Sequence, residues 1–366
     1  MKLKRKILLE ALDKLKPGLS PKELVEQMTQ FNFLGKHLVT YNEIVSVFVP
    51  FETDFICSVK ADVFQGILSK LGETDMELGL VEEEVKDDAG EAVAIKYNLS
   101  LATESTEAEF PVLIEGDISE AMRTLEKDMQ GEWLPLPDDF SEGAYLCMFS
   151  ASKDPADNTM TCINVDGSDL TCCDNTRATW YTMESEMLPF LMQAVVAKEL
   201  KRYNPKAYRI GENWIHFKSE DDIVFNVRRV KGKMKDVRPF FTKEGIEFNV
   251  PVELKEAIDL AGVVNADDSV MDRLVELSIE NKRAICKAWK DGGARVKKEV
   301  PIPFYAGEDI SFYINPDFMM EIIEHSEPDT ESGQKSPKMI INMQKRMAYF
   351  VNKKFDHALL LRADKK

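Results

Sequence analysis

The chain repeats one order of predicted elements three times, and this repeat limits the fold more than any other feature of the sequence. In the first third, four apolar residues recur at helical spacing from Leu8 to Leu15, and Pro17-Gly18 ends the predicted helix. Apolar alternation around turn residues then predicts strands, and the same order follows again. The predicted elements are a helix at 8–15, strands at 31–41 and 44–49, a helix at 61–71, and strands at 92–95 and 98–103.

The other two thirds follow the same order. Asp166-Gly167 predicts a hairpin turn because this dipeptide tolerates positive φ, and Asn315-Pro316 predicts a helix start. The middle third has helices at 144–151 and 189–203, a hairpin at 161–171, and strands at 207–210, 214–218 and 223–230. The last third has helices at 252–263 and 316–324, a hairpin at 283–296 turning at 291–293, and strands at 339–342, 348–351 and 358–361.

The period of the repeat sets the domain organisation. One third of 366 residues is 122. We therefore expect an α+β protein of three similar domains, each with two helices and an antiparallel sheet. The predicted domains are residues 1–129, 130–246 and 247–366.

The composition indicates a globular protein with an acidic surface. Hydrophobic residues make up 44% of the chain and charged residues 30%, which is enough apolar material for packed cores. Lys and Arg number 47 against 64 Asp and Glu, a net charge of −17. This balance argues against a surface that is basic all over, but it does not say where the positive charges lie.

Six cysteines are sparse for this length and match no disulfide framework or CxxC spacing. We expect reduced, mostly buried thiols in a cytoplasmic protein. Glu10 interrupts the apolar run that follows the basic start, and no apolar stretch reaches the length of a membrane span, so we expect neither export nor membrane insertion. The cysteines are Cys57, Cys147, Cys162, Cys172, Cys173 and Cys286.

Two polar segments interrupt the repeat, at 81–88 and 326–338. The first is an acidic run, and carboxylate clusters are able to bind Mg²⁺ or Ca²⁺. Its spacing matches no EF-hand loop. We therefore interpret both segments as solvated loops and expect no metal and no cofactor.

No known catalytic motif is present. The sequence lacks a phosphate-binding loop, a GxGxxG turn, a GxSxG elbow and an HExxH pair. The four histidines, His37, His216, His325 and His357, are far apart in sequence. Cys172-Cys173 are adjacent in a predicted strand and so point to opposite faces, which does not favour a shared metal ion. A non-enzymatic protein is expected, although one sequence leaves room for an enzyme with an unfamiliar constellation.

Basic residues on the predicted helices are more informative. Lys198, Lys201 and Arg202 follow one another at helical spacing and form a positive stripe. Lys14, Lys70 and Lys255 lie on helices of the other thirds. A single lysine near a helix C-terminus is favoured by the helix dipole and needs no further role. Repetition on equivalent helices fits a surface that follows a phosphate backbone without reading bases.

Four passages together resemble the bacterial DNA polymerase III β subunit, the sliding clamp, over essentially the whole chain. Residues 98–111 are similar to the last strand of the family's first domain, and 170–178 resemble its Thr-Asp-Gly-x-Arg-Leu motif. Residues 209–215 with 230–237 resemble a closing hairpin and its following turn, and 358–362 resemble the apolar C-terminal segment. Low overall identity indicates a phage or otherwise divergent relative.

The resemblance implies a head-to-tail homodimer of three-domain subunits that closes as a ring, with helices lining the hole. It places Leu99 and Leu101 of one subunit against Val263 and Val264 of the other. Each of these four residues has an alternative interpretation as an ordinary core residue.

Two functional surfaces are also implied by the resemblance. The hole would be lined by Lys14, Lys70, Lys198, Lys201, Arg202 and Lys255, with Lys22 as a loop contact. A pocket for short partner peptides would be formed by Arg177, Ala178, Phe240, Phe241, Leu359, Leu361 and Arg362. Asn175-Thr176 and Ala178 depart from the family motif, and residues 363–366 extend past its usual end, so the peptide preference is expected to differ.

The predicted function is that of a non-enzymatic processivity factor that encircles duplex DNA without sequence preference. Its partners would be a DNA polymerase, a clamp loader and a second copy of the chain, with no membrane. Two alternatives stay open: an enzyme built on repeated α+β domains, with a Cys nucleophile, and a clamp-fold protein scaffold that does not encircle DNA. The sequence does not identify the polymerase or the loader.

Overall fold

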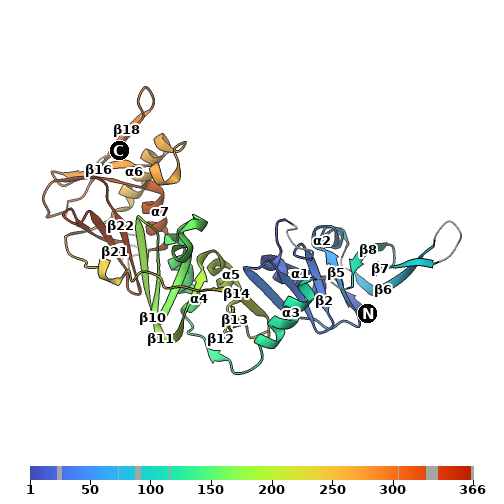
Figure 1. Cartoon of the computed structure of the whole chain (residues 1–366). Coiled ribbons are helices and arrows are strands. Elements are labelled where there is room, and N and C mark those ends of the chain that lie inside the picture. The colour runs from blue at the N-terminus through green and yellow to red at the C-terminus, as the bar shows by residue number, and fades with distance from the viewer. Residues whose placement is uncertain are drawn as a thin grey trace. The chain divides into compact units, whose positions relative to one another are not determined.

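The computed structural model describes residues 1–22, 27–72, 74–86, 92–114, 117–303, 305–326 and 337–363. The chain divides into two compact units (Figure 1). Unit 1 contains Met1–Ser141 and Val195–Val230, and unit 2 contains Glu142–Ala194 and Lys231–Lys366. The middle third of the chain is thus shared between the units, and the division into three domains stays a prediction.

Unit 1 combines antiparallel strands with α-helices. Its helices are α1 (Arg5–Leu15), α2 (Ala61–Lys70), α3 (Asp117–Asp128) and α5 (Ala197–Tyr203), and α4 (Phe140–Cys147) begins at its boundary. Its strands are β1 (Lys2–Lys4), β2 (Gln30–Leu34), β3 (His37–Tyr41), β4 (Val45–Pro50), β5 (Ile56–Lys60), β6 (Asp75–Lys86), β7 (Ala92–Ala102), β8 (Glu107–Leu113), β9 (Leu134–Pro135), β12 (Ala207–Ile210), β13 (Trp214–Lys218) and β14 (Val224–Val230).

The strands of unit 1 form one continuous series of antiparallel pairs. The order is β9, β12, β13, β14, β4, β3, β2, β5, β8, β7, β6, β1. The strand β8 joins two sheets, because its first part pairs with β7 and its last two residues pair with β5. Pro111 lies where β8 changes partner, a position where the missing N–H removes no bond from a central strand.

Unit 2 contains two sheets and two long helices, α6 (Val252–Gly262) and α7 (Pro316–His325). One sheet has the order β10, β11, β22, β21, β20, β15, and the other has the order β18, β17, β16, β19. The strands are β10 (Cys162–Cys173), β11 (Arg177–Gln193), β15 (Ile246–Asn249), β16 (Val275–Glu280), β17 (Arg283–Trp289), β18 (Arg295–Pro301), β19 (Ile310–Ile314), β20 (Lys338–Asn342), β21 (Met347–Val351) and β22 (Phe355–Leu360).

Short 3₁₀ segments connect many of these elements. They are η1 (Lys16–Gly18), η2 (Met148–Ser150), η3 (Pro155–Thr161), η4 (Ala194–Val196), η5 (Arg238–Phe240), η6 (Val263–Asn265) and η7 (Val270–Asp272).

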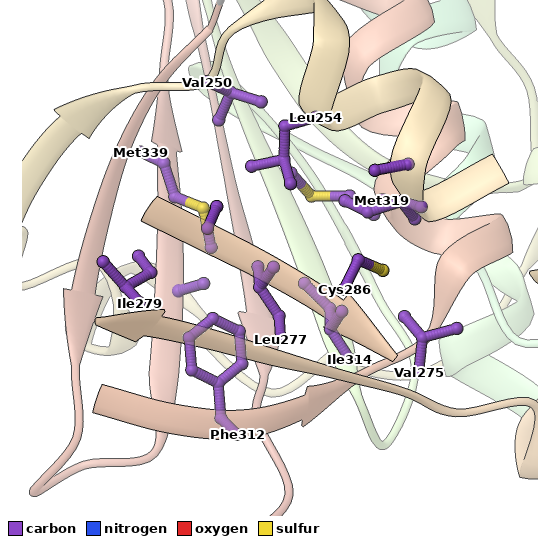
Figure 2. Packing of buried hydrophobic residues seen from close by; sticks show 14 of the residues in the cluster. Val250, Leu254, Val275, Leu277, Ile279, Cys286, Phe312, Ile314, Met319 and Met339 are labelled. Carbon is purple, nitrogen blue, oxygen red and sulfur yellow. The ribbon is translucent and has the colours of Figure 1, made fainter. Parts of the chain in front are cut away.

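The core of unit 2 lies between its helices and sheets (Figure 2). Leu254 of α6 and Met319 of α7 pack with Leu277 of β16 and Phe312 of β19, and all four are completely buried. Burial of such side chains contributes about 1.5–3 kcal/mol each. The helices therefore take their positions from the apolar stripe that the sequence periodicity predicts.

The predicted helices at 8–15, 61–71, 252–263 and 316–324 are confirmed as α1, α2, α6 and α7. In α7 the Asn315 side chain accepts a hydrogen bond from the Phe318 N–H, and Pro316 occupies the first turn, as the cap signal predicts. The hairpin turning at 291–293 is confirmed between β17 and β18. Sequence signals that act within a few residues were therefore interpreted correctly here.

The hairpin predicted at Asp166-Gly167 is wrong. Gly167 has a φ of +64° but lies at an irregularity within the long strand β10. The chain turns at residues 174–176 instead, where Asp174 Oδ1 accepts hydrogen bonds from the N–H groups of Thr176 and Arg177. A glycine with positive φ marks a bulge as readily as a turn, and pairing with β11 decides between them.

Two further predictions need correction. The helix predicted at 189–203 is shorter, because residues 189–193 belong to β11 and α5 begins only at Ala197. The acidic run at 81–88 is not a loop up to Lys86, since residues 81–86 continue β6 and pair with β7. Asp87 and Asp88, residues 327–336 of the second polar segment, and residues 364–366 lie outside the described residues.

A buried histidine of the sheet in unit 1 contacts the end of α3. His216 on β13 has no exposed surface, and its Nδ1 lies 2.6 Å from Asn226 Oδ1 while its Nε2 lies 3.1 Å from Asp128 Oδ2 at the end of α3. The Asn226 amide donates to the Ser46 carbonyl, which fixes its oxygen toward the ring. His216 is therefore a structural residue.

Replacing His216 by Leu is expected to lower the free energy of unfolding by about 2–4 kcal/mol, because the buried Asn226 Oδ1 and the half-buried Asp128 Oδ2 lose their shared partner. Urea denaturation followed by circular dichroism measures the loss. The exposed Asn213 offers a control, since Asn213→Ser is expected to change stability by less than about 0.5 kcal/mol. Equal stability of the two variants would contradict this role of His216.

Candidate functional sites

The structure brings some of the predicted DNA-contacting residues together in unit 1. The last turn of α5 lies against the last turn of α1, because Arg202 Nη2 donates to the Asp13 carbonyl at 3.3 Å and the Tyr203 hydroxyl donates to the Lys14 carbonyl. We call this group the basic cluster. It consists of Lys14, Lys16, Lys198, Lys201 and Arg202.

Nearby carboxylates only partly offset the charge of the basic cluster. Asp13 lies 2.6 Å from Lys16, Glu199 lies 3.6 Å from Arg202, and Asp221 lies 3.9 Å from Lys14. Such solvent-exposed pairs contribute only about 0–1 kcal/mol, so these cations are able to exchange partners. The cluster thus gathers five cations at two helix ends on a chain whose net charge is −17.

The other predicted DNA contacts lie elsewhere. Helices α1 and α2 are antiparallel, since Arg5 near the start of α1 donates to the Leu68 carbonyl near the end of α2. Lys70, at the end of α2, therefore lies away from the basic cluster. Lys22 is exposed in a turn after α1, and Lys255 is a half-buried residue of α6 in unit 2, 3.9 Å from Glu324.

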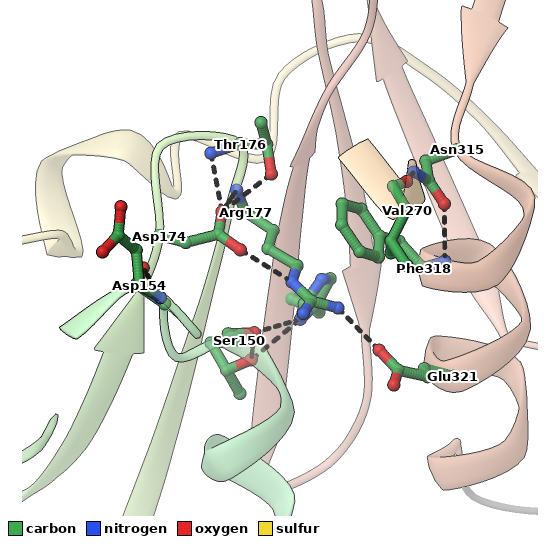
Figure 3. A network of polar contacts seen from close by, with 12 residues as sticks. Ser150, Asp154, Asp174, Thr176, Arg177, Val270, Asn315, Phe318 and Glu321 are labelled. Atoms are coloured by element: carbon green, nitrogen blue, oxygen red, sulfur yellow. Dashed lines mark hydrogen bonds and ion pairs between the residues drawn. The ribbon is translucent and has the colours of Figure 1, made fainter. Parts of the chain in front are cut away.

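A second candidate site surrounds Arg177 in unit 2. Arg177 begins β11, is only 4% exposed, and donates from Nε to Asp174 Oδ2 at 3.1 Å and from Nη1 to Glu321 Oε2 at 2.6 Å (Figure 3). Its guanidinium carbon lies 3.8 Å from the centre of the Phe318 ring. The arginine thus joins the β10–β11 turn to α7 through ion pairs and a cation–π contact.

A pocket of about 370 Å³ opens beside Arg177. Its apolar wall comes from Ala151, Val270 and Phe318, and its polar rim from Ser152, Lys153, Asp154, Asp157, Asp174, Asn175 and Ser269. Asn175, where the family motif has glycine, is not among the residues with positive φ. The turn therefore tolerates this departure without backbone strain.

The predicted peptide-pocket residues fall on two faces of the β11–β22 pair. Ala178 shares a face with Trp180, which packs on Phe241 with ring centres 5.8 Å apart. Leu359 and Leu361 point to the opposite side, where they belong to the buried core of unit 2. Both side chains have almost no accessible surface in the single chain, and their place in a partner pocket stays a prediction.

The two remaining predicted pocket residues lie apart from Arg177. Phe240 is 46% exposed and lies under the Lys235 ammonium at 5.2 Å. The backbone of Arg362 pairs with Tyr313 at the edge of the β16–β19 sheet. Sequence reasoning missed Phe318, Val270 and Trp180. Phe318 carries a detectable signal as a residue of the first turn of a capped helix, but nothing local connects it to Arg177.

The predicted subunit-interface residues differ in their exposure to solvent. Leu99 and Leu101 on β7 have no exposed surface, so these side chains are not available to a second subunit and that assignment needs correction. Val263 is 69% exposed and Val264 is half-buried at the end of α6. The exposed valine stays a candidate contact.

His357 is a completely buried histidine that contacts two hydroxyl groups. His357 Nδ1 lies 2.8 Å from Thr179 Oγ1 and 3.3 Å from Ser150 Oγ. Burial, with smaller effects of Arg177 and His325, holds the pKa of His357 well below its usual range, so the ring is neutral. None of these groups reaches solvent, and together they form a packed polar contact rather than an open site.

The cysteines have the properties of core residues. Burial raises the pKa of Cys57 and Cys286 to about 12 and that of Cys173 to about 11, and it raises the pKa values of Cys147, Cys162 and Cys172 as well. A thiolate, not a thiol, is the nucleophile in cysteine chemistry. Within the described ranges, no three His, Cys, Asp or Glu side chains are grouped so as to hold a metal ion.

The raised pKa values predict that native thiols react slowly. At pH 8, below every raised value, the thiols stay protonated in the folded chain, and Ellman's reagent is expected to modify few or none within minutes. The same reagent in guanidinium is expected to modify all six. Rapid modification of one native cysteine would instead support the alternative of a Cys nucleophile.

The fold and the two surfaces define a class of protein: paired helices on antiparallel sheets, with a basic helix cluster and a partly apolar pocket. Solved structures with this fold include bacterial DNA polymerase III β sliding clamps. None of the helices in the described part of the chain is long and apolar enough to span a membrane.

The similarity extends over the whole chain. The β subunit from the DNA polymerase of Streptococcus pyogenes has a TM-score of 0.79 at 16% identity and covers 99% of both chains. The β sliding clamp of Caulobacter crescentus has a TM-score of 0.81 at 12% identity over 99% of this chain and 98% of its own. A sliding clamp of Pseudomonas aeruginosa has a TM-score of 0.78 at 13% identity, with 100% and 99% coverage.

Comparison of sequences alone gives no such match. No protein-family model matches the chain, and no curated protein matches it in sequence. Identities of 12–16% establish the fold and nothing finer. The protein therefore has the sliding-clamp fold, as the resemblance implied.

Proposed function

We propose that this protein is a DNA sliding clamp, a non-enzymatic processivity factor of a DNA polymerase. The observation that carries the proposal is the match of fold over the entire chain to proteins described as sliding clamps. The basic cluster on helices α1 and α5 supports it, because helical lysines and arginines are suited to phosphate backbones. The proposed site of action is the cytoplasm.

Encirclement solves a physical conflict between holding DNA and moving along it. Phosphate contacts strong enough to retain a protein also slow its movement. A closed ring retains DNA by topology, so its inner surface needs only weak attraction. The partly compensated cations of the basic cluster fit this requirement, and the acidic remainder of the chain would repel DNA from other surfaces.

The proposed ring is a head-to-tail homodimer, and two unpaired sheet edges support it. In the described residues, β8 pairs through Glu107–Pro111 only with β7, and β18 pairs only with β17. Glu107 and Glu109 are exposed on the first edge, and Arg295 and Lys297 on the second. Free edges are templates for strand pairing between chains, and these two carry opposite charge.

Partner proteins would bind unit 2. The pocket beside Arg177 has an apolar wall for an anchoring side chain and a polar rim for backbone contacts, which suits a short peptide. The face formed by Ala178, Trp180 and Phe241 is a neighbouring candidate. We assign these surfaces to peptides of the polymerase and of a clamp loader.

Topology gives the decisive test of encirclement. The protein is mixed with nicked circular plasmid under dilute, high-salt conditions that let subunits exchange, and it is then returned to low salt and gel-filtered. We expect it to stay on circular DNA and to leave after a restriction enzyme opens the circle. Linear DNA with streptavidin-blocked ends is expected to retain it.

Equal retention on circular and open linear DNA, or equal loss from both, would contradict encirclement. Retention that depends on charge alone would instead favour simple surface binding. A dimer that never retains DNA would favour a clamp-fold protein scaffold.

The basic cluster gives a second test. The variant K198E/K201E/R202E is expected to reduce the slope of log affinity against log salt by about 2–3, because about 0.9 counterions are released per phosphate contact. The control K231E/K233E/K282E makes the same change in net charge at exposed residues outside the cluster. We expect the control to keep most of the wild-type slope, and equal slopes in the two variants would refute a local role for the cluster.

A further inference from the structure

The acidic segment of the sequence forms an arm on unit 1 that the proposed DNA and peptide surfaces do not use. Residues 81–86 of β6 pair with 92–98 of β7, while β8 pairs with β7 only from Asn98 onward and β1 pairs with β6 only at 75–77 (Figure 1). Among the described residues both edges of this arm are unpaired. A bare two-stranded ribbon is marginally stable in water, so a partner surface would stabilise it.

The two faces of the arm differ. Glu82 lies opposite Tyr97 and Glu84 opposite Ile95, and these four residues share one face. On the other face Glu83 lies opposite Lys96, which offsets its charge. Ile95 is 54% exposed. Among the side chains that the structure describes, the first face is therefore both negative and apolar.

A surface of complementary character lies on unit 2. In the hairpin of β17 and β18, Lys287 is directly opposite Lys297, and Trp289 is directly opposite Arg295. The buried Ala284, Cys286 and Ala288 alternate with the β17 residues of this face, so the face points away from the core. Like charges directly opposite destabilise a strand pair unless anions offset them.

The carboxylates within unit 2 offset only part of this charge. Glu276 lies 3.2 Å from Lys287, and Glu299 lies 2.6 Å from Lys297 and 3.0 Å from Arg283. The described residues provide no ion pair for the exposed Arg295. The hairpin is therefore a positive surface that also offers the half-buried Trp289.

We propose that the arm of one copy binds the β17–β18 hairpin of a second copy, with Glu82 and Glu84 against Arg295 and Lys297 and with Ile95 and Tyr97 against Trp289. This inference rests on the proposed head-to-tail homodimer. Two observations identify the second copy as the occupant: the opposite charge of the surfaces, and the continuity of the arm with the β8 edge and of the hairpin with the β18 edge.

The test is the dimer dissociation constant of the full-length protein, measured by sedimentation equilibrium over a range of salt. E82K/E84K is expected to weaken the dimer about tenfold or more at low salt, and the difference is expected to shrink at high salt, where screening weakens charge pairs. E212K/E220K, at exposed glutamates of unit 1 outside the arm, is the matched control and is expected to keep the wild-type constant. Far-UV circular dichroism verifies folding.

Reversing the charges of the hairpin as well gives a double-mutant cycle between the arm and the hairpin. R295E/K297E is expected to weaken the dimer similarly, and E82K/E84K/R295E/K297E is expected to recover most of the affinity, because each arm then meets a hairpin of opposite charge again. Zero-length carbodiimide cross-linking of wild type is expected to join Glu82 or Glu84 to Lys297 between chains.

Two outcomes distinguish a failure of the proposed ring from a failure of the arm contact alone. A wild-type chain that stays monomeric at every concentration would overturn the proposed ring and the arm contact together. A wild-type dimer whose constant is unchanged in E82K/E84K, or a fourfold variant that is not restored, would overturn the arm contact alone.

Discussion

Antiparallel strand pairing is the constraint on which the rest of this structure depends. Each unit extends its sheets by adding hairpins, and every such series must end in strands with unpaired backbone groups. In unit 1 the strand β8 connects the β2–β5 side to the β6–β7 side by changing partner at Pro111. Among the described residues, this change leaves the first part of β8 with one unpaired edge, and β6 and β7 continue as an arm. The candidate association surfaces are thus consequences of how the sheets end.

Charged residues of one sign gather on particular helix ends and strands. A net charge of −17 describes the chain as a whole, yet the cations of α1 and α5 gather because two helix ends meet through Arg202 and Tyr203. Helix C-termini favour cations through their dipoles, so two such ends in contact build a positive surface at low cost. Strand β18 concentrates Arg295, Lys297 and Lys298, whereas the arm part of β6 concentrates Glu82, Glu83 and Glu84. Local geometry, not the total charge, determines which partner each surface suits.

Sequence reasoning succeeded where the signal and the structure lie within a few residues of each other. The apolar stripe of α1 and the Asn315 cap of α7 act locally, and both helices were predicted. Gly167 misled because a bulge and a turn use the same backbone conformation, and only the register with β11 separates them. The glutamates of β6 led to the incorrect prediction of a loop. Charged residues predict exposure to solvent, and an exposed strand meets that requirement as well as a loop does. Arg177 was singled out from a motif, but Glu321, 144 residues away, is brought to it only by tertiary packing.

The opposite charges of the acidic arm and the basic β17–β18 hairpin also limit the symmetry with which two copies can associate. A two-fold contact brings identical patches together, which here would set the glutamates of one arm against those of another, or one lysine-rich hairpin against its copy. Each arrangement places like charges together and is unfavourable at moderate salt. A heterologous contact pairs the acidic arm with the basic hairpin and uses both surfaces of every chain. Such a contact leaves an unused arm on one terminal copy and an unused hairpin on the other until the series closes, and closure pairs these two surfaces. The charge pattern therefore favours a closed head-to-tail dimer, in which both contacts form, over an open dimer with only one.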